Sequence, residues 1–99
     1  SVHTQNDFSS EAIKRYHEQM LDHAKTEMRA IEVGQREYSS TTFVMSDKQM
    51  AKAKDLIRSF KADFESILTA PETDMIGTNV YQIQIQFFPL TIEGGINEA

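Results

Sequence analysis

The chain has no cysteine among its 99 residues. This absence excludes disulfide bridges, thiolate metal sites and cysteine nucleophiles, and it fits a reducing compartment. No apolar run approaches the roughly 20 residues that a membrane-spanning helix needs. No signal-peptide pattern opens the chain either. We therefore expect a cytoplasmic protein that does not enter a membrane.

Positive charge is also scarce, with 10 lysines and arginines against 15 aspartates and glutamates and a net charge of -5. This balance argues against bulk attraction of the chain to nucleic acid or anionic lipid. A short basic strip at Lys54, Arg58 and Lys61 is continued by Glu65. We interpret it as the charged rim of a helix, because nucleic-acid binders normally carry a dominant basic patch.

Motifs that carry chemistry are absent from the sequence. The four glycines form no phosphate-binding loop, and there is neither an HExxH nor a GxSxG pattern. The spacing of Glu18 and Asp22 suits an acid–base pair, but we interpret both as part of a solvated helix face, because a catalytic carboxylate needs burial or a cleft. We predict no catalytic residue, no metal and no cofactor, and hence a protein that is not an enzyme.

The length fits one domain or a piece of a longer protein. Residues 1–8 are polar and aperiodic and are predicted to be a flexible linker. Residues 92–99 contain glycine and are polar, and we predict a flexible tail there. The interval 9–91 is then a single domain.

Two amphipathic helices are predicted from apolar residues that recur every three or four positions. The first is expected to begin at a serine cap near Ser9 or Ser10 and to end at Gly34 as a left-handed cap. The second should follow a capping box from Ser46 to Gln49 and end at Pro71. Their apolar stripes comprise Ile13, Tyr16, Met20, Ala24, Met28 and Ile31 in the first and Met50, Ala53, Ile57, Phe60, Phe64 and Ile67 in the second.

Two segments are predicted to be β-strands. Residues 40–45 are rich in β-branched and aromatic side chains. Residues 80–88 alternate strictly, with Tyr81, Ile83, Ile85 and Phe87 on one face and Gln82, Gln84 and Gln86 on the other.

The predicted fold is therefore α/β, with the order α-β-α-β. We expect a two-layer α+β arrangement, in which two long helices pack on one face of a small sheet whose strands run parallel. Because two strands make a marginal sheet, a second chain is expected to extend it. The sequence thus favours a homodimer formed through a sheet edge or a helix face.

The glutamine face of the longer strand is the predicted interaction surface. Gln82, Gln84 and Gln86 lie on it, and Phe88 follows at its end. Solvent exposure, a polar ligand and contact with another chain all remain possible interpretations, and the apolar Phe88 weakens the first of them.

A pocket is the competing interpretation. It would lie between His17, Arg36 and the sheet, and would make the chain a small ligand-binding or enzymatic domain. His17 falls within the apolar stripe, so we predict a partly buried structural histidine. His23 is expected to form an ion pair at low pH with Glu27, one helical turn further on.

Three stretches of the sequence resemble a known bacterial family: Tyr16 to Ala24, Arg36 to Thr42, and Val80 to Thr91, which ends in FFPLT. The family consists of conserved hypothetical proteins described as transcriptional regulators, and the similarity is to their C-terminal domain of unknown function. It covers residues 10–91.

The resemblance implies a non-enzymatic regulatory, sensing or dimerising domain. Contact with nucleic acid would occur only through an N-terminal half that this chain lacks. The family has no established catalytic residues, so none is transferred to this chain.

Overall fold

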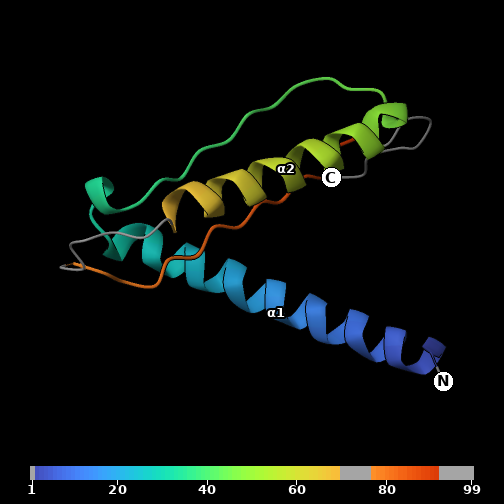
Figure 1. Cartoon of the computed structure of the whole chain (residues 1–99), viewed down its shortest axis with the longest axis horizontal. Coiled ribbons are helices and arrows are strands. Elements are labelled where there is room, and N and C mark those ends of the chain that lie inside the picture. Colours follow the sequence, from blue (N-terminus) through green and yellow to red (C-terminus); the bar gives the residue numbers. More distant parts are fainter. Residues whose placement is uncertain (1, 70–76, 92–99) are drawn as a thin grey trace. The chain divides into compact units, whose positions relative to one another are not determined.

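The computed structural model describes residues 2–69 and 77–91, with side chains from residue 10 onward (Figure 1). Its order is α1 (Val2–Ala30), a 3-10 turn η1 (Val33–Gln35), a second 3-10 turn η2 (Asp47–Gln49) and α2 (Met50–Leu68). The chain divides into two compact units, Ser1–Asp47 and Lys48–Ala99, which we describe separately. Neither described helix is both long and apolar enough to cross a membrane.

The predicted α/β fold is wrong, because residues 2–69 and 77–91 contain helices but no strand. Residues 40–45 and 80–88 form no ladder and run as irregular chain, the latter coloured orange in Figure 1. The predicted sheet, its parallel pairing and the packing of both helices on it are all overturned. The physical reason is that alternation favours an extended backbone, whereas a strand also needs a neighbouring strand that pairs with it in a regular ladder.

Helix α1 covers the first predicted helix but differs from it at both ends. It begins at Val2 rather than near Ser9. It ends at Ala30, and a final backbone bond joins the Ile31 amide to the Glu27 carbonyl at 3.0 Å. Gly34 lies in η1 without a left-handed backbone, so the predicted glycine cap is wrong. The tighter 3-10 turn supplies the termination instead.

Helix α2 agrees closely with the second predicted helix. The apolar stripe keeps the helical period throughout Met50–Leu68. Its start differs from the predicted capping box, because η2 leads directly into α2 and Gln49 takes the N-cap position without a side-chain bond to the helix. At its other end the Thr69 hydroxyl and amide both donate to the Glu65 carbonyl, at 2.7 and 2.9 Å. Pro71, the predicted terminator, lies outside the described residues, as does the predicted tail.

No residue is buried among those whose side chains the structure describes, 10–69 and 77–91. Large apolar side chains of both units remain exposed, including Ile13 and Leu21 on α1 and Leu56 and Ile67 on α2. The apolar stripes are therefore present as sequence predicts, but they do not enclose a core. Soluble monomers seldom leave contiguous apolar surface of this kind open.

Candidate interaction surface

An apolar stripe runs along α2 in the second unit. We define the α2 face as Ala53, Leu56, Ile57, Phe60, Phe64 and Ile67. Ala53 and Ile57 are half-buried, whereas Phe60 is 52% and Ile67 72% exposed. Spacings of three and four residues bring all six side chains to one side of the helix.

Two aromatic rings lie at the middle of the α2 face. The centroids of Phe60 and Phe64 are 5.5 Å apart, and their planes are tilted by 46°. This is a favourable offset contact between rings one helical turn apart. The rings thus form a coherent apolar ridge along the helix.

Residues 77–91 contribute further apolar side chains in the same unit. Tyr81 is 73% exposed, while Ile83, Ile85 and Phe87 are exposed by 43, 41 and 36%. Gly77 begins the segment with φ at 81°, a left-handed conformation that glycine adopts without strain. These four residues of the predicted apolar face are all exposed, so the alternation predicted from sequence does not separate a covered face from an open one.

The four residues of the predicted glutamine surface all lie in this irregular segment. Gln84 is half-buried, whereas Gln82, Gln86 and Phe88 are exposed. Because the described residues form no strand, the prediction that these four residues share one face of a sheet is wrong. Their role as a contact surface stays a prediction.

In the first unit, Arg36 and Tyr38 fasten the chain that follows η1 to the end of α1. The Tyr38 hydroxyl donates to the Ala24 carbonyl at 2.6 Å, and Arg36 Nε donates to the Ile31 carbonyl at 2.9 Å. The guanidinium carbon also lies 5.4 Å from the centroid of the Tyr38 ring, within cation–π range. Sequence reasoning gave no signal for this arrangement, in which Tyr38 bonds to a residue 14 positions earlier in the chain.

The predicted pocket residues are not brought together. His17 is exposed, not partly buried as predicted, and its ring lies edge-on to Tyr16 with centroids 5.6 Å apart. Arg36 bonds to the Ile31 carbonyl. At a helical rise of 1.5 Å per residue, Ile31 lies about 21 Å further along the helix axis than His17. An arginine side chain cannot span that separation.

The other histidine prediction is confirmed. His23 Nε2 lies 3.7 Å from Glu27 Oε1, one turn apart on α1. Glu27 is half-buried and lies within the apolar stripe. Within the described residues, no three histidine, aspartate or glutamate side chains gather as metal ligands would.

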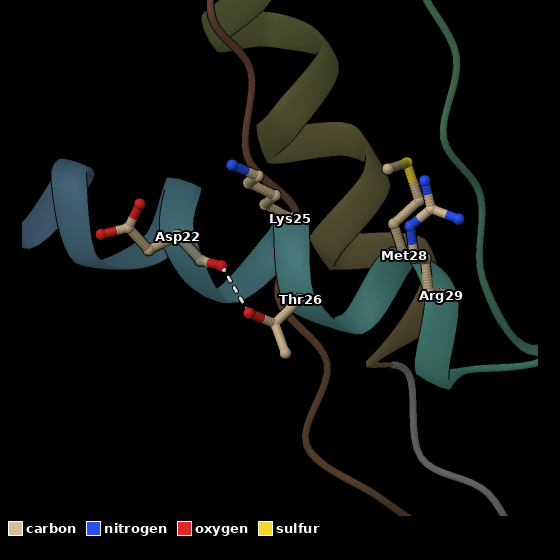
Figure 2. A pocket seen from close by; sticks show the side chains of 5 residues that line it. All are labelled: Asp22, Lys25, Thr26, Met28 and Arg29. Carbon is tan, nitrogen blue, oxygen red and sulfur yellow. Dashed lines mark hydrogen bonds between the residues drawn. The ribbon is translucent and has the colours of Figure 1, made fainter.

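One shallow hollow of the first unit lies on α1 (Figure 2). The dashed line in Figure 2 marks the only polar contact drawn there, in which the Thr26 hydroxyl donates to the Asp22 carbonyl at 3.2 Å. The hollow is open, and its charged groups are of both signs. It is lined by Asp22, Lys25, Thr26, Met28 and Arg29. All five come from one helix, so the hollow is the ordinary relief of a helix surface and does not enclose a ligand.

Comparison with known proteins gives one assignment. Residues 1–90 match a family described as a domain of unknown function, DUF4423. No curated protein and no solved structure matches the chain.

Proposed function

Because the chain belongs to the DUF4423 family, whose function is unknown, we propose its role from its surface: a non-enzymatic regulatory domain that binds another protein chain. It would serve dimerisation or sensing in a bacterial transcriptional regulator. The DNA-binding half of that regulator would lie N-terminal to the domain. The partner we propose is a second copy of the chain.

One observation carries this proposal: no described residue is buried, although both helices have well-formed apolar stripes. Burial of apolar surface supplies most of the favourable free energy of folding, at roughly 25 cal/mol per Å². A chain that keeps Leu56, Phe60 and Ile67 in water gains little of it. A second chain that covers this surface supplies the missing burial.

The alternative of a small ligand-binding or enzymatic domain required a pocket between His17, Arg36 and a sheet. Arg36 bonds beyond the end of α1, far along the chain from His17, and the described residues form no sheet. The arrangement therefore favours a surface for another macromolecule over a site for a small substrate.

The mass of the protein in solution tests the proposal. We expect sedimentation equilibrium to give twice the 11.3 kDa of the chain at micromolar concentration. A strictly monomeric chain that unfolds cooperatively would refute the dimerisation role, because it would have completed a core without a partner.

Gln84→Lys tests whether the segment 77–91 belongs to the contact surface. Gln84 is the half-buried member of the predicted surface. A lysine there adds a charge that must be desolvated when another chain covers it. We expect the dissociation constant of the dimer to rise about tenfold, equivalent to about 1.4 kcal/mol.

The matched control for this variant is Thr78→Lys, which adds the same charge at an exposed position of the same segment. It should leave the dissociation constant unchanged. Equal affinity of the two variants and the parent chain would remove Gln84 from the surface.

A further inference from the structure

We propose that Arg36 and Tyr38 form a latch, which opens and closes in the folded chain and, when closed, ties the connection to the second unit against the end of α1. The inference goes beyond the proposed dimerisation. Every contact that carries it lies within the first unit, Ser1–Asp47. These contacts therefore require neither a partner chain nor any residue of the second unit.

The latch lies where the chain reverses direction after η1 (Figure 1). Arg36 has an extended backbone, with φ at -144° and ψ at 159°, and its Nε donates to the Ile31 carbonyl at 2.9 Å. Two residues later, the Tyr38 hydroxyl donates to the Ala24 carbonyl at 2.6 Å. Between these two bonds the acceptor moves back towards the start of α1 by about 10 Å, at 1.5 Å per residue. Residues 36–38 therefore run back alongside the last turns of α1.

The two acceptor carbonyls differ in their other bonds. Ile31 follows the last residue of α1, and its carbonyl is one of those that a helix end leaves without an amide partner. The Arg36 guanidinium suits this place, because the C-terminal end of a helix carries partial negative charge. Ala24 lies inside α1, where the amide of Met28 is the helical partner of its carbonyl. The Tyr38 hydroxyl therefore uses the second lone pair of that oxygen, and its departure leaves the helix intact.

Opening the latch leaves no buried polar group without a partner. Both bonds are formed by exposed groups, and Tyr38 itself is 43% exposed, so water can replace each partner. A hydrogen bond that exchanges with water shifts an equilibrium by only about two- to tenfold. The guanidinium carbon of Arg36 lies 5.4 Å from the centroid of the Tyr38 ring, and this contact couples the two side chains. The closed state is therefore favoured modestly, and the open state keeps a population on the order of a per cent.

The place of the latch in the chain gives it a role in passing a signal. The second unit begins at Lys48, and residues 39–47 lead to it. When the latch is closed, this connection starts from Tyr38, fixed beside α1. When it is open, the connection starts at the end of η1 and is longer by residues 36–38. A ligand or partner that binds one of the two states better would change how closely the second unit follows α1. This use of the latch in a regulator rests on the proposed function, but the latch itself does not.

Tyr38→Phe in the full chain isolates the latch, because it removes the hydroxyl and keeps the ring that Arg36 contacts. Trypsin cleaves after arginine, and the bond after Arg36 becomes accessible to it when the latch opens. If opening and closing are fast relative to cleavage, the cleavage rate is proportional to the open population. We expect cleavage after Arg36 to be about fivefold faster in the variant than in the parent chain, since one hydrogen bond is lost.

Two controls distinguish local opening from general loss of structure. Cleavage after Arg58, in the interior of α2, follows unfolding of the second unit and should keep its rate. Tyr81→Phe removes a hydroxyl from a tyrosine of the second unit that is 73% exposed, and it should leave both rates unchanged.

Two results would overturn the latch. One is an unchanged rate of cleavage after Arg36 in Tyr38→Phe. The other is an equal rise after Arg36 and after Arg58, because the hydroxyl would then support the whole fold. Neither rate is a measurement of molecular mass, so failure of the latch and failure of the proposed dimer are separate results.

Discussion

Phe60→Asp should convert the dimer into monomers and raise its dissociation constant at least about 100-fold. Phe60 lies at the centre of the α2 face, where its ring contacts Phe64. A second chain that covers this face would have to bury the new carboxylate. Removing a charge from water costs several kcal/mol, which exceeds the loss of the phenyl ring alone.

The measurement is sedimentation equilibrium over a concentration series, with helix content followed by circular dichroism. Ser66→Asp is the matched control, since it adds the same charge to the same helix away from the apolar face. It should leave the association unchanged. If both variants dimerise like the parent chain, Phe60 does not lie in the interface.

Ala62→Pro is expected to lower the free energy of unfolding by about 3 kcal/mol or more and to abolish association. Ala62 lies in the interior of α2 on its exposed side. Proline there removes an amide donor and clashes with the Arg58 carbonyl one turn earlier. The effect acts through the backbone, because the alanine side chain covers nothing.

Urea unfolding at one fixed protein concentration, monitored by circular dichroism, measures this loss. Ala62→Gly is the control and should cost only about 1 kcal/mol, the difference in helix propensity. A proline variant as stable as the glycine variant would mean that this turn of α2 contributes nothing to the folded state.

The helices could be predicted from the sequence because their signal is local and repeated. In α2 the apolar stripe recurs over the whole interval Met50–Leu68, and each added turn strengthens the same conclusion. The ends were less predictable. At the C-terminal end, Gly34 lies in the 3-10 turn η1 and does not cap the helix as expected. At the N-terminal end, α1 begins at Val2. Helix ends depend on a single residue or turn, so one competing contact can move them.

The strands could not be predicted correctly, because pairing is a property of two segments and periodicity is a property of one. Residues 80–88 alternate as a strand does, yet alternation does not identify a partner. Parallel pairing with residues 40–45 would also require a long connection to close first. The structure leaves both segments without a ladder.

The candidate site was predicted in part. The pairing of His23 with Glu27 followed from a one-turn spacing and is confirmed at 3.7 Å. The contacts of Tyr38 with Ala24 and of Arg36 with Ile31 were missed, since they depend on how the chain reverses after α1. The α2 face was identified as apolar from its period, but its exposure could be known only from the structure.

The absence of a buried residue from the described segments links the fold of this domain to its abundance. If a second copy completes the core, folding and association are one equilibrium, governed by mass action. Below the dissociation constant, chains would be largely unfolded and open to proteolysis, and above it they would be protected. The rate of synthesis would then set a threshold, so that a regulator built on this domain acts only once enough of it has accumulated.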